Sequence, residues 1–499
     1  VLGLFMSSCY TPKAVEYPDA PVLPATTDST LSGTNDSTMM SYQQFKDSSG
    51  MGYQQLKDSS VLSHQQFKDS SVMTYQQFFA DPYLKQLLDT ALRNNTDVQL
   101  ALQRVEMTKA QLMAANRAWL PTVNGAVDAG VERYGDYTMN GVGNYDTNLS
   151  PNIDNKQRIP NPTPNYFIGL RSAWEIDLWG KLKNGKKAAQ QRMLASEQGR
   201  RLVTTQLIAN VAAMYYQLLA LDNERSVLER NIALQESALA TVRIQQEAGR
   251  ATLLAVQQFH AQLLNTQSFM MGIKQQTTRL ENQLNALLGR FPQAIPRDTA
   301  LLTAPLPPFA NLGMPASLLS HRPDIRQAAL ELGAAKADVA AAKASFLPSV
   351  NINPYVGFNS FKGNLLFNTG SVAYGLLGGI TAPILNKKQL AAQYQVNSAN
   401  ALSAFYNYRQ RVIDAYQEVM TALAQLHNGQ EAFRLKEAEV VMLRDGVSTA
   451  NDLYMTNYAN YLEVITAQKS VLEAELALAN SRKELFLGTI ELYRALGGM

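Results

Sequence analysis

The stretch NNTDVQLALQRVEMTKAQLMAANRAWLPTV, residues 94–123, occurs a second time in the chain as HRPDIRQAALELGAAKADVAAAKASFLPSV, residues 321–350. The two stretches align without a gap, and nine of their thirty pairs are identical, among them Asp97 with Asp324. A second pair of segments, 249–289 and 457–497, shares seven identical residues of forty-one and is the weaker match. A doubled chain of this length indicates one pseudosymmetric body built from two structural repeats.

The composition restricts the classes of protein to which the chain can belong. With 499 residues, 46% of them hydrophobic and 17% charged, the chain can bury a core, yet it is poor in charge for an ordinary soluble protein. The formal charge of +3 is small, and no basic cluster interleaved with aromatic residues appears, so nucleic acid is not expected as a partner. No run of about eighteen apolar residues is present, so no membrane-spanning helix is expected.

The only cysteine, Cys9, follows the apolar, small-residue run LFMSS, residues 4–8. Such a run is typical of the end of a secretory signal. We therefore interpret residues 1–8 as the remnant of a signal peptide and Cys9 as the cysteine of a bacterial lipobox, whose thiol is acylated. Acyl chains add a membrane affinity of about 0.8 kcal/mol per buried methylene. The alternative is a chance cysteine in a disordered leader.

Residues 9–74 are rich in Pro, Ser and Thr and contain tandem eleven-residue copies. The three copies are YQQFKDSSGMG from residue 42, YQQLKDSSVLS from residue 53 and HQQFKDSSVMT from residue 64. Their Asp-Ser-Ser triplets favour caps and turns over helix interiors, and repeated polar tracts usually lack a packed core. We interpret the segment as a linker; the alternative is an adhesive surface array.

Downstream, long stretches have helical periodicity. Residues 181–247 contain no proline, and a heptad seam from Val211 to Val242 is apolar at eight of ten positions, the exceptions being Arg225 and Gln235. A helix of this extent would be roughly 100 Å long. After Gly249 the pattern predicts a returning helix over 252–288, and segments 387–454 and 459–496 repeat the plan. A soluble coiled-coil rod is the alternative.

The period changes to two in four segments between the helices, which predicts two β-hairpins, over residues 120–179 and 347–385. One face of these strands is apolar and carries Val123, Val127, Ala129 and Val131 in the first strand; Tyr166, Ile168, Leu170, Trp174, Ile176 and Leu178 in the second; Val350, Ile352, Val356 and Phe358 in the third; and Val372, Tyr374, Leu376, Ile380 and Ile384 in the fourth. Polar residues such as Asn124, Asp128 and Arg171 oppose them.

All three tryptophans lie at one end of these strands. Trp119 precedes the first strand, and Trp174 and Trp179 stand where the second strand leads into the long helix. Indole rings at a single level are typical of a membrane interface, so we expect these residues to form an interfacial belt against outer-membrane lipid. The alternative is a set of core tryptophans.

Four strands cannot close a barrel, and open sheet edges are not tolerated in lipid, so several chains must share one barrel. Two chains would give eight strands and an interior filled by side chains. Three would give twelve strands and leave room for a lumen. The sequence therefore predicts an oligomer, and passage of a solute requires the larger number.

Six motifs resemble the TolC-like outer-membrane efflux proteins, in the lipoprotein branch that serves multidrug efflux pumps. They are YQQFFADPYLKQLLDTALRNN from residue 75, AWLPTV from 118, WEIDLWGKL from 174, HRPDI from 321, SFLPSV from 345 and LYRALGG from 492. The resemblance covers about residues 75–498. It divides the chain, after the linker, into a first structural repeat over 75–310 and a second over 311–499, with helical hairpins at 181–289 and 387–496.

The resemblance implies a mainly α fold with membrane β-structure: a homotrimer with a shared twelve-stranded barrel in the outer membrane, continued by a coiled-coil helical barrel through the periplasm. Its partners would be a periplasmic adaptor (membrane fusion) protein and an inner-membrane pump of the RND type. The adaptor docks on the helix tips, which here comprise Gly249, Arg250, Ala251, Thr252, Asn457 and Ala459. The protein would be anchored to the outer membrane by lipid.

In the family, the tip end is closed by inward coiling of the helices, tyrosine hydrogen bonds and rings of acidic side chains. The resemblance assigns this gate to Tyr454, Tyr458, Asn460, Glu463 and Thr466. Glu463 matches an acidic position, and three copies brought together by symmetry would repel one another and attract cations or basic residues.

This chain departs from the family pattern at two places near the gate. Thr466 stands where aspartate is common, which puts a second acidic ring in doubt, and Asn457 replaces the usual turn glycine, a change that asparagine tolerates. The alternatives are that Glu463 is a solvated surface glutamate and that Tyr454, Tyr458 and Tyr461 are packed knobs between helices.

No catalytic, metal or cofactor site is expected. The four histidines, His64, His260, His321 and His427, are isolated in sequence, and no phosphate-binding glycine loop is present. The chain is therefore predicted to be a passive, gated exit duct for drugs or other small molecules, driven by a partner. The competing hypotheses are a periplasm-spanning structural lipoprotein that never conducts and a type I secretion duct for proteins.

Overall fold

The computed structural model describes residues 74–298, 305–306, 321–456 and 458–498, which fall into two compact units. The first unit combines residues 106–194 with 330–406, and the second combines residues 74–105 and 195–298 with 321–329 and the described part of 407–498. Each unit therefore contains segments of both sequence repeats. The expected signal remnant, Cys9 and the eleven-residue copies lie outside the described residues.

The helix boundaries reproduce the repeats found in the sequence. Helices α4 (Thr96–Arg117) and α8 (Pro323–Ala344) each have 22 residues and begin at aligned positions of the first repeated pair. Helices α7 (Leu253–Leu287) and α10 (Tyr461–Ala495) each have 35 residues and are related by the alignment of the second pair. The internal duplication is therefore confirmed, including in the segments where sequence identity is low.

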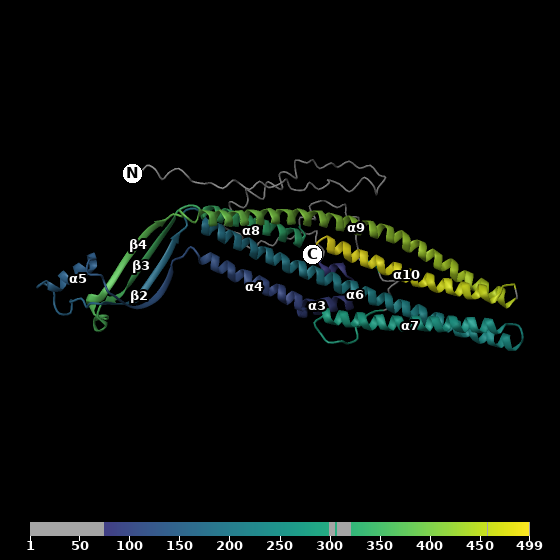
Figure 1. Ribbon diagram of the computed structural model, residues 1–499. Coiled ribbons are helices and arrows are strands. Elements are labelled where there is room, and N and C mark those ends of the chain that lie inside the picture. Colours follow the sequence, from purple (N-terminus) through teal and green to yellow (C-terminus); the bar gives the residue numbers. More distant parts are fainter. Residues whose placement is uncertain (1–73, 299–304, 307–320, 457, 499) are drawn as a thin grey trace, which may run out of the picture. The chain divides into compact units, whose positions relative to one another are not determined.

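The first unit is organised around a four-stranded antiparallel sheet in the order β1-β2-β3-β4 (Figure 1). The strands are β1 (Thr122–Glu132), β2 (Thr163–Ile176), β3 (Ser349–Ser360) and β4 (Val372–Thr381). Their register pairs Val127 with Ile168, Ile168 with Phe358, and Phe358 with Val372. The four apolar faces predicted from the sequence are therefore confirmed as one continuous face.

This apolar face is open to the surroundings of the chain. Val127 is 77% exposed, Leu376 is 72% exposed and Ile380 is 75% exposed. An exposed apolar patch of this kind marks a surface that contacts lipid or another protein.

The opposite face of the sheet is polar and carries an ion pair. Arg171 lies 2.5 Å from Asp128, and its guanidinium also lies over the ring of Phe167, 4.5 Å from the ring centre. Gly169 and Gly357 pair beneath this ring, and a Cβ atom at either position would approach the neighbouring strand to 2.5 Å or less. Glycine is therefore required at both positions for the strands to pair.

The two hairpin connections differ. Between β1 and β2 the chain forms helix α5 (Met139–Leu149), which begins at Thr138, whose hydroxyl accepts a hydrogen bond from the Gly141 amide. Between β3 and β4 there are only two short 3₁₀ turns, η2 (Gly363–Leu365) and η3 (Thr369–Ser371). The sequence reasoning did not anticipate α5, which is absent from the shorter connection of the second repeat.

The tryptophans lie near the helix-proximal end of the sheet, where Trp174 is half-buried and the other two are exposed. Trp119 is 55% exposed and Trp179 is 50% exposed. Two indole nitrogens donate to backbone oxygens, Trp174 to Trp119 at 2.8 Å and Trp179 to Pro348 at 2.7 Å. Trp119 and Trp179 are therefore not part of the core of the single chain, and the interfacial belt stays a prediction.

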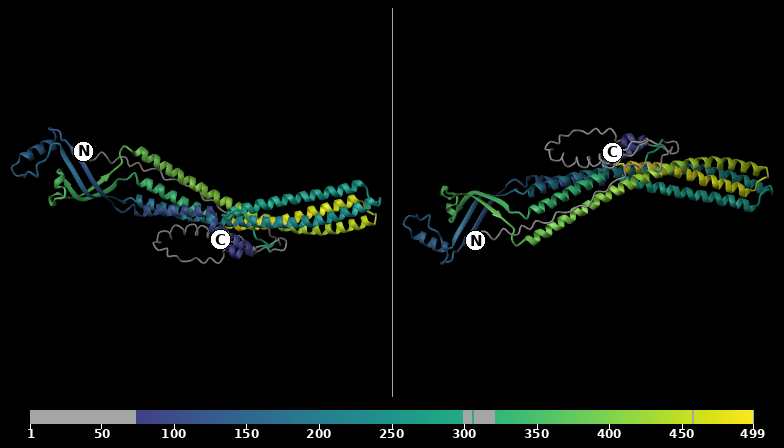
Figure 2. Two further views of the ribbon diagram at one scale, coloured as in Figure 1. Left: turned by 90° about the horizontal axis from the view of Figure 1, so that it is seen from below. Right: turned by 90° about the horizontal axis from the view of Figure 1, so that it is seen from above.

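The second unit is helical. Helices α6 (Lys181–Glu247) and α9 (Lys387–Met455) cross both units, and in the second unit α7 returns alongside α6 and α10 alongside α9 (Figure 2). The short helices α2 (Tyr75–Phe78) and α3 (Pro82–Asn94) pack onto this body. Its largest core cluster includes Phe78, Leu84, Leu88, Val211, Tyr215, Leu218, Leu284, Leu288, Phe486 and Ile490.

The heptad seam predicted on α6 is confirmed as the buried stripe of this helix. Val211, Leu218, Leu228 and Val242 are buried, as is the polar seam residue Gln235, whereas Arg225 is exposed. The fold class, mainly helical with four strands in a duplicated chain, is also confirmed. Among the described residues, no helix combines the length and the apolar character needed to cross a membrane.

Candidate functional site

The hairpin of α6 and α7 ends in a tight turn. Gly249 has a φ of +67°, a left-handed conformation that glycine adopts without steric cost. The amides of Arg250 and Ala251 both donate to the carbonyl oxygen of Gln245, at 2.7 and 3.2 Å. These bonds satisfy the last carbonyl groups of α6 and fix the reversal of the chain.

The hairpin of α9 and α10 ends in a turn with the same hydrogen bonds. The amides of Tyr458 and Ala459 donate to the carbonyl oxygen of Leu453, at 2.8 and 3.1 Å. Asn457, the counterpart of Gly249, lies outside the described residues. The two turns predicted as adaptor-docking tips are therefore alike in their hydrogen bonding, while docking itself stays a prediction.

A side-chain cap follows each turn. The Thr252 hydroxyl accepts from the Ala255 amide at 3.2 Å at the start of α7. At the start of α10, Asn460 Oδ1 accepts from the amides of Leu462 and Glu463, at 2.9 and 3.2 Å. Both residues satisfy amide groups that have no partner within the helix, so both tips are stiffened where the helices begin.

Glu463 has a structural contact as well as an exposed carboxylate. Asn460 Nδ2 donates to Glu463 Oε1 at 3.1 Å, which completes a reciprocal cap. A negative charge in the first turn of α10 also interacts favourably with the helix dipole. Thr466 lies exposed one turn further along the same helix. This arrangement is compatible with both interpretations of Glu463, a surface cap and an acidic gate residue.

Tyr454 joins the two hairpins. Its hydroxyl, near the end of α9, donates to Gln245 Oε1 on α6 at 2.5 Å. Burial raises the pKa of the Tyr454 hydroxyl, so this group remains a proton donor throughout the neutral range. Tyr454 also packs with Tyr461 against a core cluster, whereas Tyr458 is 85% exposed. The packed-knob interpretation therefore fits Tyr454 and Tyr461 but not Tyr458.

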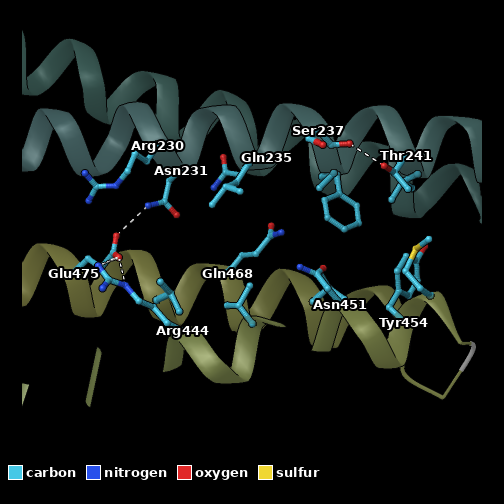
Figure 3. A pocket seen from close by; sticks show the side chains of 18 residues that line it. Arg230, Asn231, Gln235, Ser237, Thr241, Arg444, Asn451, Tyr454, Gln468 and Glu475 are labelled. Atoms are coloured by element: carbon cyan, nitrogen blue, oxygen red, sulfur yellow. Dashed lines mark hydrogen bonds and ion pairs between the residues drawn. The ribbon is translucent and has the colours of Figure 1, made fainter. Parts of the chain in front are cut away.

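A cavity of about 560 Å³ opens between the hairpins, and Tyr454 is part of its lining (Figure 3). All four helices of the two hairpins contribute to its walls. At one end, Glu475 on α10 is buried and accepts from Arg444 Nε at 2.7 Å and from Asn231 Nδ2 at 3.4 Å. Because Asn231 lies on α6 and Arg444 on α9, this carboxylate links both hairpins.

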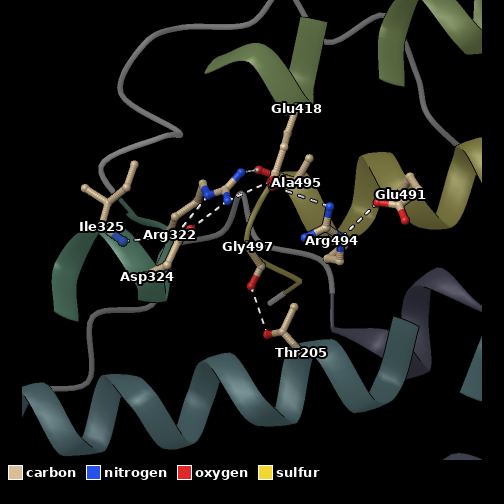
Figure 4. A network of polar contacts seen from close by, with 9 residues as sticks. All are labelled: Thr205, Arg322, Asp324, Ile325, Glu418, Glu491, Arg494, Ala495 and Gly497. Carbon is tan, nitrogen blue, oxygen red and sulfur yellow. Dashed lines mark hydrogen bonds and ion pairs between the residues drawn. The ribbon is translucent and has the colours of Figure 1, made fainter. Parts of the chain in front are cut away.

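A second polar network surrounds Arg322, in the motif HRPDI (Figure 4). Its guanidinium donates to Asp324 at 2.7 Å, to Glu418 at 2.9 Å and to the carbonyl oxygen of Ala495 at 2.8 Å. Burial alone would raise the pKa of the Asp324 carboxyl, but the hydrogen bond and charge of Arg322 outweigh it and hold this pKa below its ordinary value. The network ties the start of α8 to α9 and to the end of α10.

Sequence reasoning located the tips but not the partners of their side chains. The sequence did not identify three residues that connect the helices, Gln245, Asn231 and Glu475. Each forms its hydrogen bond with a residue on another helix or more than thirty positions away, which local sequence patterns do not reveal. Arg322 was visible in the sequence only as part of the motif HRPDI, and its ion pairs with Asp324 and Glu418 could not be predicted from that motif.

Within the part of the chain that the structure describes, no group of three or more His, Cys, Asp or Glu side chains is placed to hold a metal ion. The polar groups at the tips and in the two networks are caps, ion pairs and amides. What they can do chemically is hold helices together and attract or repel charge.

Comparison with known proteins gives a consistent result. A model of the family "Outer membrane efflux protein" matches residues 87–290 and 314–498, and so covers both repeats. The cation efflux system protein CusC of Escherichia coli K12 is 27% identical over 424 residues, which are 84% of this chain and 87% of CusC. The pyoverdine export outer membrane protein OpmQ of Pseudomonas putida is 28% identical over 420 residues, 84% of this chain and 87% of OpmQ. A crystal structure of CusC superposes with a TM-score of 0.76 at 26% identity, covering 88% of this chain and 97% of that one.

Proposed function

The chain belongs to the outer membrane efflux protein family, and from this premise we propose that it is the passive, gated exit duct of a tripartite efflux system for small molecules. The observation that carries the proposal is the single apolar face shared by all four strands, on which Val127 is 77% exposed. A face of this kind marks contact with lipid or with another protein, and the family to which the chain belongs favours the lipid of the outer membrane.

Three copies of the chain form the duct. Strands β1 and β4 lie at the two ends of the sheet and leave unpaired edges among the described residues. In lipid such edges must pair, and three copies of four strands give a twelve-stranded barrel with room for a lumen. The six hairpins of the same three copies form the wall of the helical tunnel.

The duct has no energy source of its own, so an inner-membrane pump of the RND type and a periplasmic adaptor supply the driving force and the connection. The adaptor docks on the hairpin tips, at the turns of Gly249 and of Ala459. Because the two turns have the same pattern of hydrogen bonds, each chain offers the adaptor two similar surfaces. Acylated Cys9 adds an anchor in the outer membrane, an assignment that is supported by the apolar run before it, residues 4–8.

The gate lies at the tip end. The bond between Tyr454 and Gln245 holds the two hairpins of one chain together. Three Glu463 carboxylates, one from each chain, form an acidic ring whose members repel one another and attract basic side chains of an adaptor. An adaptor that binds these carboxylates from outside the ring draws the tips apart, so contact with the adaptor opens the duct.

Conductance of the purified protein in planar lipid bilayers tests the proposal. We expect discrete current steps, and a lower open fraction in Glu463→Ala than in Glu473→Ala, because the substitution removes the mutual repulsion of the three carboxylates; Glu473 is the matched control, since it is exposed on the same helix. A non-conducting structural lipoprotein would give no discrete steps in the native protein or in either variant, and that outcome would refute the proposal.

The transported molecules have small size in common and need not belong to one chemical type. The names of the two relatives refer to a cation and to pyoverdine, although both are about equally similar to this chain. A wide, wet lumen recognises little, so selection lies in the pump. If instead the chain restored secretion of a protein in a strain lacking its own duct, and did not restore drug resistance, the secretion hypothesis would replace this one.

A further inference from the structure

Two glutamines face each other inside the cavity between the hairpins. Gln235 projects from α6 and Gln468 from α10, and both line the space that Figure 3 shows. Gln235 is 2% exposed and Gln468 is 8% exposed. Gln235 occupies a position of the heptad seam where an apolar side chain is expected, so packing does not account for it.

The amide groups of these glutamines are not satisfied. Neither Oε1 nor Nε2 of Gln235 has a hydrogen-bond partner among the residues that the structure describes, and the same is true of Oε1 of Gln468. A buried amide without a partner is unfavourable, and such groups call for a partner from outside the chain. The unsatisfied groups comprise one donor and two acceptors, arranged on opposite walls of one cavity.

The remaining walls around the glutamines are largely apolar. Phe259 from α7, Val242 from α6, and Val464 and Val471 from α10 line the same cavity. Three charged residues, Arg230, Arg444 and Glu475, lie at one end of the cavity (Figure 3), where Arg444 pairs with Glu475 and Arg230 donates to the Ser226 hydroxyl at 2.9 Å. The centre is therefore neutral, with apolar walls and a few convergent polar atoms, which is the usual composition of a small-molecule site of about this size.

We propose that this cavity is a binding site for a neutral, drug-sized molecule that combines an aromatic or aliphatic body with one amide-like group. The amide-like group donates to Gln468 Oε1 and exchanges hydrogen bonds with the amide of Gln235. Its apolar body packs on Phe259 and the valines. An anion or a cation is disfavoured, since the unpaired groups at the centre carry no charge.

Such a ligand would contact both hairpins of one chain and act as a bridge between them. This consequence rests on the proposed function: if opening the duct separates the hairpins, a bound ligand favours the closed arrangement and lowers the open fraction. The site is then a regulatory or inhibitory one in the wall of the tunnel, distinct from the transport path. Binding itself does not depend on conduction, so the two claims can fail separately.

The test uses benzamide as a probe of the site and the full-length purified protein in deuterated detergent, with binding followed by saturation-transfer NMR. We expect saturable benzamide binding, and no saturable binding of benzoate, which has the same ring but a charged head group. Gln235→Leu should weaken benzamide binding at least about tenfold, the loss of one to two hydrogen bonds. Gln257→Leu is the matched control, because Gln257 is exposed on α7, and it should bind as the native protein does.

A folding defect would not be confused with loss of the site. Gln235→Leu places an apolar residue at a buried seam position and should raise the melting temperature, which differential scanning fluorimetry measures. Unchanged benzamide binding in a well-folded Gln235→Leu variant would overturn the proposal. The absence of any saturable binding to the native protein would also overturn it and would indicate that ordered water fills the cavity. If benzamide binds as expected but bilayers show no channels, the site stands and the proposed function fails.

Discussion

At the scale of the residue, Arg322 shows how a buried charge is accommodated. Its guanidinium donates to two carboxylates, Asp324 and Glu418, and to the carbonyl oxygen of Ala495. Burial lowers the pKa of Arg322, but the bonds to the carboxylates outweigh this effect, and the pKa is raised overall. Removing one member of such a group destabilises the fold more than replacing the whole group by apolar residues, because the remaining charges stay buried without a partner.

Arg322→Ala should therefore lower the stability of the fold by about 3–5 kcal/mol, measured by thermal or denaturant unfolding at pH 7. Arg434→Ala is the control, since Arg434 pairs with Glu431 on an exposed helix surface, and it should change the stability of the fold very little. Equal losses in the two variants would contradict the role assigned to the Arg322 network.

The lowered pKa of Asp324 also predicts an acid-sensitive contribution to stability. A carboxyl whose folded pKa lies below its unfolded value, about 3.9, stabilises the fold fully above that value and loses the contribution as pH falls through the folded pKa. Melting temperatures between pH 6 and pH 2.5 should fall on the acid side in the native protein. In Arg322→Ala the fall should be smaller, because Asp324 then has no cation to stabilise its charged form.

Near the tips, the hydroxyl of Tyr454 forms a hydrogen bond to Gln245 that joins the two hairpins. This bond can be removed while the aromatic ring of Tyr454 stays in place. Tyr454→Phe removes a bond worth about 0.5–1.5 kcal/mol, so the ratio of open to closed channels should rise a few-fold in single-channel recordings. Tyr458→Phe is the control because Tyr458 is 85% exposed, and it should leave the open fraction unchanged.

At the scale of the element, the turns depend on backbone conformation more than on contacts. Gly249 has a left-handed φ, and no atom lies within 4 Å of where its Cβ would be, so any effect of Gly249→Ala is conformational. We expect a loss of about 1 kcal/mol. Gly272→Ala is the comparison: this helical position in α7 is equally open, and the substitution should stabilise by up to about 1 kcal/mol. Melting temperatures that shift in the same direction would contradict this account.

The elements themselves could be predicted closely, and the exceptions have identifiable reasons. The limits expected for α6 match its observed limits, Lys181–Glu247, because a heptad pattern without proline leaves few alternatives. The faces of the four strands were also correct, since a period of two fixes which side chains share a face. Helix α5 was missed because its sequence, MNGVGNYDTNL, contains three asparagines and two glycines, which are poor helix formers, in a segment of only 11 residues.

At the scale of the whole molecule, the contacts that define the candidate site could not be predicted from the sequence. Tyr454 was expected to form a hydrogen bond, but its partner, Gln245, lies on another helix, 209 positions away in the chain. The heptad pattern placed Gln235 on the seam of α6, but Gln468 does not differ in sequence from a surface glutamine, and the cavity that both residues line could not be predicted. Pairings of this kind follow from how the helices pack, which periodicity does not specify.

The shared apolar face makes a prediction for assembly in the membrane. Val127→Arg places a charge on that face and should reduce the amount of trimer recovered from the outer membrane, since arginine near the bilayer midplane costs about 2–4 kcal/mol per copy. Gly130→Arg is the control, since Gly130 lies on the polar face of the same strand opposite Asn165 and has open space at its Cβ position, and this variant should assemble normally. Trimer is measured by the mass of the detergent-solubilised particle, and equal recovery of both variants would argue against a lipid-facing sheet.

The bond between Tyr454 and Gln245 breaks the likeness of the two repeats. In the alignment of the hairpins, Tyr454 corresponds to Gln246 and Gln245 corresponds to Leu453, so the bond has no twin. In a ring of six hairpins, two kinds of contact would then alternate. Three contacts lie within a chain and contain the bond between Tyr454 and Gln245, and three lie between chains and do not contain it. The mechanical properties of such a ring have threefold but not sixfold symmetry. The hairpins should therefore begin to separate at one kind of contact while the other kind stays closed.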